Sequence, residues 1–186
     1  MSKTALLIVD LQKDYFQDGK WQLEGTEAAA ANAETLLKNF RAKGWPVVHI
    51  RHEFPTTDAP FFVPGSEGAQ VYPSLKEEEG EPVVIKHQIN SFRDTPLKSM
   101  LDELGVDSVL ICGAMSHMCV DAVTRAANDF GYDCALAHDA CATRDVEFQG
   151  ITVPAGQVHA AYMSALGFAY AKVASTKELL TEILET

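Results

Sequence analysis

The chain has 186 residues, of which 47% are hydrophobic and 22% charged, a composition typical of an ordinary globular protein. This length suits one domain, and we expect residues 1–186 to form it. The formal net charge of −11 argues against nucleic acid or an anionic membrane as a partner.

The first residues, MSKTALLIVDLQKDYF, carry no recognisable targeting signal. The apolar run before Asp10 is too short for the core of a signal peptide, and no run in the chain approaches a membrane span. We therefore predict a cytoplasmic protein with free thiols. The four cysteines are Cys112, Cys119, Cys134 and Cys141. They form no CxxC pair, the motif that would suggest a zinc site or a redox couple.

The first half of the chain alternates short apolar runs with one long helical pattern. TALLIV, residues 4–9, is a continuous apolar run typical of a strand buried on both faces. Ala, Leu and Phe recur at helical spacing over residues 27–43, and Gly44 provides a stop signal. Residues 46–50 and 82–85 predict two further strands.

A long segment without a clear pattern, residues 53–81, separates these two strands. It is rich in Pro, Gly and Phe. A loop of this length inside a compact domain is usually functional, as a lid or as the wall of a pocket. We expect it to contribute to substrate specificity.

The second half continues the alternation. Thr95 is a plausible N-cap with Pro96 at the first helical position, opening a helix that runs to Leu104. Ser175 and Glu178 have the spacing of a capping box before the last helix. Between them the pattern predicts, in order, a strand at 108–112, a helix at 118–130, a strand at 133–137, a helix at 154–166 and a strand at 169–173.

Strands that alternate with helices predict an α/β fold. We expect a three-layer α/β/α domain around a doubly wound, mainly parallel six-stranded sheet. In such sheets ligands bind beyond the carboxyl ends of the strands, where the strand order reverses. The polar residues that follow the strands are therefore the first candidates for a functional site.

Three residues meet this criterion. Asp10 ends the first predicted strand, Lys86 ends the third, and Cys119 follows the fourth across a short loop. A carboxylate, an ammonium group and a thiol at one edge of a sheet would form a nucleophilic site. Singly, each residue has a structural interpretation: a turn for Asp10, a solvated strand end for Lys86, a buried thiol for Cys119.

The ionisation of such a thiol depends on its neighbours. Lys86 and the N-terminus of the helix that follows would both favour the thiolate of Cys119. The negative charge of Asp10 would oppose it, so a proton shared between Asp10 and Cys119 is an equally consistent state.

Three stretches carry a resemblance to a known family. LLIVDLQKDYF, VVIKHQINSFRDTPL and LICGAMSHMCVDAVTRAANDFGYDCALAHDA together resemble the isochorismatase-like cysteine hydrolase superfamily, in order and with its spacing. Members of that superfamily include nicotinamidases and N-carbamoylsarcosine amidases. The resemblance implies a catalytic triad of Asp10, Lys86 and Cys119, and association into dimers or tetramers.

The resemblance also implies the remaining parts of the machinery. It places a non-proline cis peptide between Ala114 and Met115, and an oxyanion hole formed by the N–H groups of Met115 and Cys119. The implied reaction is attack of Cys119 on the carbonyl carbon of a small amide, carbamoyl or ureido compound. Water then hydrolyses the thioester-type intermediate, with Asp10 as the proton carrier.

The sequence departs from two members of the superfamily. Isochorismatases proper cleave an enol ether and lack the nucleophilic cysteine, whereas Cys119 is present here. Nicotinamidases carry an Asp-x-His pair after the second strand, where this chain has His49 and His52. Two residues three apart on a strand face opposite sides and cannot converge on one ion. We therefore predict no metal and no cofactor, and we do not expect nicotinamide as the substrate.

Five residues are candidates for the substrate pocket: Tyr15, Phe16, Trp21, Gln88 and His117. The three aromatic residues follow the first strand, where they could stack on a substrate or form an aromatic cluster beneath the long loop. Gln88 and His117 lie next to the proposed triad and could contact ligand or serve structure alone.

The sequence thus predicts a hydrolase that cleaves a C–N bond of a small molecule. The alternatives are an isochorismatase-type vinyl-ether hydrolase, a thiol-redox protein that uses Cys119, and a non-catalytic protein that binds a metabolite in the same crevice. A redox protein would need a resolving cysteine near Cys119, and Cys112 on the preceding strand is poorly placed for that role.

Overall fold

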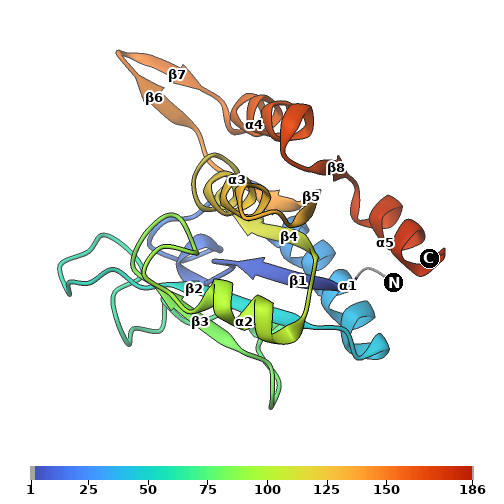
Figure 1. The fold of residues 1–186 in the computed structure, drawn as a ribbon. Coiled ribbons are helices and arrows are strands. Elements are labelled where there is room, and N and C mark those ends of the chain that lie inside the picture. Colours follow the sequence, from blue (N-terminus) through green and yellow to red (C-terminus); the bar gives the residue numbers. More distant parts are fainter. Residues whose placement is uncertain (1–2, 186) are drawn as a thin grey trace.

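The computed structural model describes residues 3–185 and contains a central sheet of six parallel strands (Figure 1). Their spatial order is β3-β2-β1-β4-β5-β8. All six were expected from the sequence, and the strands are β1 (Thr4–Val9), β2 (Val47–His52), β3 (Val83–Lys86), β4 (Ser108–Ala114), β5 (Asp133–Ala142) and β8 (Lys172–Ala174).

Helices cover both faces of the sheet, so the three-layer α/β/α prediction is confirmed (Figure 1). Successive residues of a strand point to opposite faces. In β1, Leu6 and Ile8 accordingly pack toward one helical layer, and Leu7 and Val9 toward the other. The first layer holds α1 (Thr26–Lys43) and α5 (Thr176–Glu185), and the second holds α2 (Leu97–Leu104), α3 (Asp121–Asp129) and α4 (Ala155–Ala169).

The ends of the helices follow the expected chemistry. Gly44 ends α1 in a left-handed conformation with φ +64°. The Ser175 and Glu178 side chains form the predicted capping box, because the Ser175 N–H donates to Glu178 Oε2 at 2.9 Å and the Glu178 N–H donates to Ser175 Oγ at 3.3 Å. Thr95 Oγ1 accepts from the Leu97 N–H at 3.3 Å, although the cap position of α2 is Pro96.

Four boundaries near the proposed site differ from the predictions. β2, β4 and β5 extend to His52, Ala114 and Ala142, beyond the predicted ends at residues 50, 112 and 137. The helix predicted from residue 118 begins instead with a π-helical turn, Ser116–Val120, which leads into α3.

A small hairpin was not predicted. β6 (Val146–Phe148) and β7 (Ile151–Val153) pair antiparallel and project from the body of the molecule beside α4 (Figure 1). Gln149 and Gly150 form the turn, both with positive φ.

In the long segment, residues 53–81, the second half is tied to the body by backbone hydrogen bonds. Tyr72 N donates to Leu11 O, Lys13 N to Gln70 O, and Asp14 N to Gly68 O, each at 2.9 Å. These bonds attach the second half of the segment to the residues that follow β1. In the first half, residues 55–60 are largely exposed.

The strand order reverses between β1 and β4, which are neighbours although β2 and β3 separate them in the chain. Gly113 of β4 pairs with Val9 of β1 at this point. A Cβ atom on Gly113 would lie 2.0 Å from Val9 O, and its φ is +134°. Only glycine therefore permits this close approach.

Among the residues that the structure describes, no helix combines the length and apolar character needed to cross a bilayer. The cytoplasmic location stays a prediction.

Candidate active site

Asp10, Lys86 and Cys119 converge at the carboxyl edge of the sheet, beside the point where the strand order reverses. Lys86 Nζ lies 2.9 Å from Asp10 Oδ2 and 3.2 Å from Cys119 Sγ. Asp10 and Lys86 are fully buried, and Cys119 is 2% exposed. The ammonium group of Lys86 thus contacts both the carboxylate and the thiol.

The backbone positions each of these side chains. Asp10 follows β1 directly and has a left-handed φ of +52°, which is uncommon for a residue other than glycine. Its N–H donates to Ile50 O of β2 at 2.9 Å, so the turn is anchored to the neighbouring strand. Cys119 lies in the π-helical turn, where the N–H groups of Met118 and Val120 both donate to Met115 O. Turns of this kind are frequent at functional sites.

His52 also belongs to this cluster, and the sequence analysis did not place it there. It is the last residue of β2, in register with Lys86 on β3. Because β2 lies between β3 and β1, the Lys86 side chain must pass His52 to reach Asp10. His52 Nδ1 lies 3.1 Å from Lys86 Nζ, and the carbonyl oxygen of Gln88 accepts from the same ammonium group at 3.1 Å.

The two histidines of β2 face opposite sides of the sheet, as predicted. His49 Nε2 contacts Glu81 at 2.8 Å, on the side where Arg41 of α1 also reaches Glu81. His52 faces Lys86 on the other side.

Burial and neighbouring charges set the ionisation of the cluster. Burial raises the pKa of the Cys119 thiol well above its ordinary value and Asp10 raises it further, while Lys86 lowers it. Burial opposes the charge of Lys86, but Asp10 and Cys119 raise the pKa of Lys86 above its ordinary value. The resting site therefore holds a charged lysine and a protonated thiol, so the expected thiolate-favouring effect of Lys86 does not prevail.

The backbone between β4 and Cys119 has two features of interest. The Ala114–Met115 peptide bond is cis, at the position that the family resemblance implied. Among residues 3–185, the N–H group of Met115 donates to no protein acceptor. This donor is therefore available close to the thiol.

Tyr15 lies near the cluster, and the other aromatic candidates pack against the long segment. Burial raises the pKa of Tyr15, and the charges of Cys119 and Asp10 raise it further. Phe16 stacks on Tyr72 with ring centroids 3.6 Å apart, and Trp21 stacks on Phe61 at 4.8 Å. These contacts form the aromatic cluster that was one of the two interpretations of these residues.

Gln88 and His117 take up separate positions. Gln88 contributes its backbone carbonyl oxygen to Lys86. His117 Nδ1 lies 2.6 Å from Thr143 Oγ1, and burial followed by the charge of Arg144 lowers the pKa of its imidazole. Their contact with a substrate stays a prediction.

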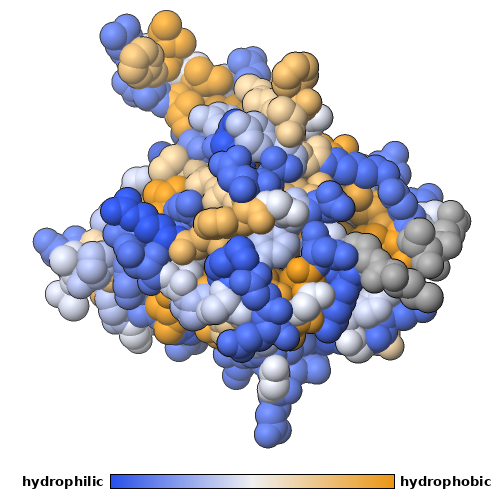
Figure 2. All heavy atoms as spheres, viewed as in Figure 1, coloured by the Kyte–Doolittle hydropathy of each residue, from blue (hydrophilic) through white to orange (hydrophobic). Residues whose placement is uncertain are grey.

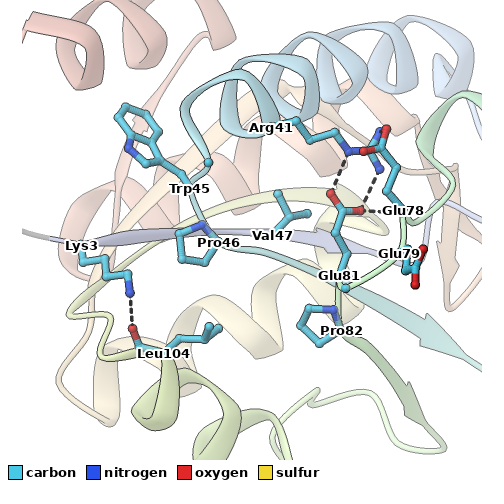
Figure 3. Close-up of a pocket in the computed structure, with 12 residues that line it drawn as sticks. Lys3, Arg41, Trp45, Pro46, Val47, Glu78, Glu79, Glu81, Pro82 and Leu104 are labelled. Carbon is cyan, nitrogen blue, oxygen red and sulfur yellow. Dashed lines mark hydrogen bonds and ion pairs between the residues drawn. The ribbon is translucent and has the colours of Figure 1, made fainter.

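A cavity of about 470 Å³ lies at the opposite edge of the sheet, near the amino ends of β2 and β3 (Figure 3). Arg41 and Glu81 form an ion pair at its wall, and Lys3 Nζ donates to Leu104 O at 2.6 Å (Figure 3). It holds no nucleophile, and Asp10, Lys86 and Cys119 do not line it.

The donor atoms of Asp10, His52 and Cys119 lie within 4.8 Å of one another, a spacing that could hold a metal ion. Lys86 Nζ already lies within hydrogen-bonding or ion-pair distance of each of them. The positive charge among these three donor atoms is thus the ammonium group of Lys86. The expected absence of a metal or cofactor remains a prediction.

Comparison with known proteins identifies the family. An isochorismatase domain profile matches residues 4–154, which include Asp10, Lys86 and Cys119. The chain belongs to the isochorismatase family of hydrolases.

Several isochorismatase-family proteins match nearly the whole chain. A crystal structure described as an isochorismatase hydrolase from Oleispira antarctica is 62% identical, covers 97% of each chain and superposes with a TM-score of 0.94. The uncharacterized isochorismatase family protein YddQ of Bacillus subtilis (strain 168) is 45% identical over 95% of this chain and 98% of its own. A streptothricin hydrolase of Streptomyces noursei is 36% identical over 88% of this chain and 65% of its own.

Proposed function

We propose that this isochorismatase-family protein is a cysteine hydrolase that cleaves a C–N bond of a small amide, carbamoyl or ureido compound. The observation that carries the proposal is the shared contact of Lys86 Nζ with Asp10 Oδ2 at 2.9 Å and with Cys119 Sγ at 3.2 Å. It places a nucleophile, a proton acceptor and a fixed positive charge within reach of one another.

The first step begins from the protonated thiol. Asp10 removes the Cys119 proton as the sulfur attacks the carbonyl carbon, and the C=O electron pair moves to oxygen. The N–H groups of Met115 and Cys119 are the proposed donors to this oxyanion. The unoccupied N–H of Met115 supports this role. Each such donor contributes about 3 kcal/mol to the transition state.

The second half returns the enzyme to its starting state. The tetrahedral intermediate collapses as Asp10 gives its proton to the leaving nitrogen, so that the C–N bond breaks and a thioester or thiocarbamate remains on Cys119. Water then attacks this carbonyl carbon while Asp10 removes a proton from the water. The C–S bond breaks, the acid product leaves, and Asp10 returns the proton to the sulfur of Cys119. Lys86 starts protonated, because Asp10 and Cys119 raise its pKa in the resting site. It takes no part in proton transfer in the proposed cycle.

The relatives support the class of reaction but do not name the substrate. The name of the streptothricin hydrolase shows that one relative hydrolyses a small organic compound. The buried thiol beside Asp10 favours acyl transfer over enol-ether cleavage, which needs no nucleophilic sulfur.

The test is turnover of a broad panel of small amides, carbamoyl compounds and ureides, followed by release of ammonia or amine. Cys119→Ala should abolish release while circular dichroism and the melting temperature stay close to the wild-type values. Mass spectrometry of the wild-type protein during turnover should find an acyl adduct on Cys119. Turnover by Cys119→Ala would disprove the mechanism, and hydrolysis of a vinyl ether alone would favour the isochorismatase-type alternative.

We further propose that the protein is a homo-oligomer. Phe168 of α4 is 91% exposed, and Phe148 and Ile151 of the projecting hairpin are 71% and 66% exposed. Hydrophobic surface is visible on the projecting hairpin in Figure 2. Exposed apolar surface of this kind marks sites of protein association.

A further inference from the structure

His52 is a buried imidazole beside the triad, and the mechanism above assigns it no task. The side chain is 4% exposed. Its backbone is held on both sides by Gln12, since the His52 N–H donates to Gln12 Oε1 and Gln12 Nε2 donates to His52 O, both at 2.8 Å. The ring therefore has a defined position at the end of β2.

The contact with Lys86 determines which ring nitrogen carries the proton. A charged lysine can only donate hydrogen bonds, so His52 Nδ1, at 3.1 Å from Lys86 Nζ, must accept. Burial, followed by the charge of Lys86, lowers the pKa of His52 to about 4, against the opposing effect of Asp10 and with a small contribution from His87. The imidazole is neutral at neutral pH, and its one proton lies on Nε2.

This leaves a buried donor without an acceptor. His52 Nε2 makes no hydrogen bond within the described part of the chain, although buried N–H groups are nearly always paired. The neighbouring rings, Phe54 with its centroid at 4.7 Å and Phe62 at 6.2 Å, offer no conventional acceptor. An orphaned donor beside a nucleophile is the expected state of a group whose partner arrives with the substrate.

We propose that His52 is a dual-purpose residue that positions the Lys86 ammonium through Nδ1 and donates a hydrogen bond from Nε2–H to an acceptor on the substrate. The inference rests on the proposed amide hydrolysis and narrows its substrate class. The substrate would carry, besides the scissile carbonyl, a second oxygen or nitrogen acceptor close to it, as in a 2-oxo amide or a ureide.

The two functions can be separated by substitution. Asparagine places an oxygen near the position of Nδ1 and nothing at Nε2, whereas glutamine places a donor near Nε2 and no acceptor at Nδ1. Pyruvamide and propionamide form a matched pair of substrates, because only pyruvamide has a second carbonyl oxygen.

Pyruvamide is also the more electrophilic amide, so the informative quantity is the ratio of kcat/KM for pyruvamide over propionamide compared between proteins. We expect His52→Asn to lower this ratio about tenfold relative to the wild type, the effect of one hydrogen bond. His52→Gln should retain the wild-type ratio while lowering kcat for both substrates, because Lys86 loses an acceptor. An equal ratio in all three proteins would overturn the proposal for Nε2, and unchanged kcat in His52→Gln would overturn the proposal for Nδ1.

A measurement without substrate distinguishes failure of this inference from failure of the proposed function. NMR of a protein labelled with 15N-histidine gives a signal for each ring, and the signal that disappears in His52→Asn is that of His52. In the wild-type protein at pH 7 this signal should report a neutral ring with its proton on Nε2. A proton on Nδ1, or a charged ring, would contradict the inference even if amides are hydrolysed. The absence of any amide turnover together with the expected tautomer would overturn the proposed function and the substrate contact, and leave only the contact of Nδ1 with Lys86.

Discussion

The Cys119 thiol lies between two groups with opposite effects on its proton. Lys86 favours the thiolate, whereas Asp10 and the burial of the sulfur favour the thiol, and the second pair prevails. In the resting site the proton therefore stays on the sulfur. This arrangement protects a cysteine from oxidation and alkylation while it waits, because only the thiolate is a strong nucleophile.

Asp10→Asn should separate the reactivity of the thiol from catalysis. Removing the negative charge lowers the pKa of Cys119, so alkylation by iodoacetamide at pH 7.5 should become about tenfold faster. Turnover should fall by about 10³-fold because no group remains to carry the proton. Mass spectrometry locates the label on Cys119, and Cys119→Ala serves as the control. Slower alkylation of the variant would show that Asp10 does not hold the thiol in its protonated form.

The convergence of Asp10, Lys86 and Cys119 could be expected from the sequence because each follows a predicted strand. The same rule applied to β2 would have identified His52, whose strand was predicted to end at residue 50 but extends to residue 52. The ionisation of Cys119 could not be predicted in the same way. It depends on how completely the sulfur is buried, which the order of residues along the chain does not reveal.

At the level of elements, Gly113 sets the distance between β1 and β4. Gly113→Ala should destabilise the fold by about 3 kcal/mol or more, since the new Cβ would lie 2.0 Å from Val9 O at a φ of +134°. Chemical denaturation measures this loss. Gly156→Ala in α4 is the matched control, because its Cβ would meet nothing within 4 Å, and its stability should change by less than about 1 kcal/mol. Equal stability of the two variants would contradict the close approach.

Glu81 links α1, β2 and the segment that precedes β3. It accepts hydrogen bonds from Arg41 Nε at 2.8 Å and Arg41 Nη2 at 2.7 Å (Figure 3). It also contacts His49 Nε2 at 2.8 Å. Partial burial opposes its charge, but the hydrogen bonds from Arg41 and the Glu78 N–H and the contact with His49 lower its pKa to about 2. The carboxylate is thus ionised in the folded protein well below pH 4.

This shift predicts a pH dependence of stability. Because the folded pKa lies below the unfolded value of about 4.5, the stabilisation is present above that pH and is lost as the pH falls toward 2. Glu81→Gln should lower stability at pH 7 by about 2 kcal/mol and flatten its decline between pH 4.5 and 2. Denaturation at several pH values measures both effects. Glu79→Gln, on an exposed side chain of the same segment, should reproduce the wild-type profile.

The hairpin shows where prediction from the pattern fails. β6 and β7 have only three residues each, so their alternation of apolar and polar residues is too short to predict a strand, and Phe148 and Ile151 are exposed. The continuous apolar runs of β1 and β4 were visible because both faces of those strands are covered. The strands that could be predicted from the sequence were thus the buried ones.

For the whole molecule, the exposed residues of α4 and the hairpin predict association. Sedimentation should give a mass of two or four chains, and Phe168→Asp should shift the population toward single chains because a charge would be buried in the contact. Phe130→Asp is the comparison, at the residue that caps the C-terminus of α3, where the side chain is 52% exposed. Sedimentation of the wild-type protein as a single chain would contradict the predicted association.

The attachment of the long segment has a consequence for which of its parts can move without disturbing the site. Residues 68–72 are bonded to the turn after Asp10, and Gln12 Nε2 also donates to Ala69 O at 2.8 Å, so displacing them would disturb the residues that hold Asp10 and His52. Residues 55–60 make no backbone–backbone hydrogen bond to the rest of the described chain. Movement of residues 55–60 would therefore leave in place the backbone bonds that fix the catalytic geometry, whereas movement of residues 68–72 would break them.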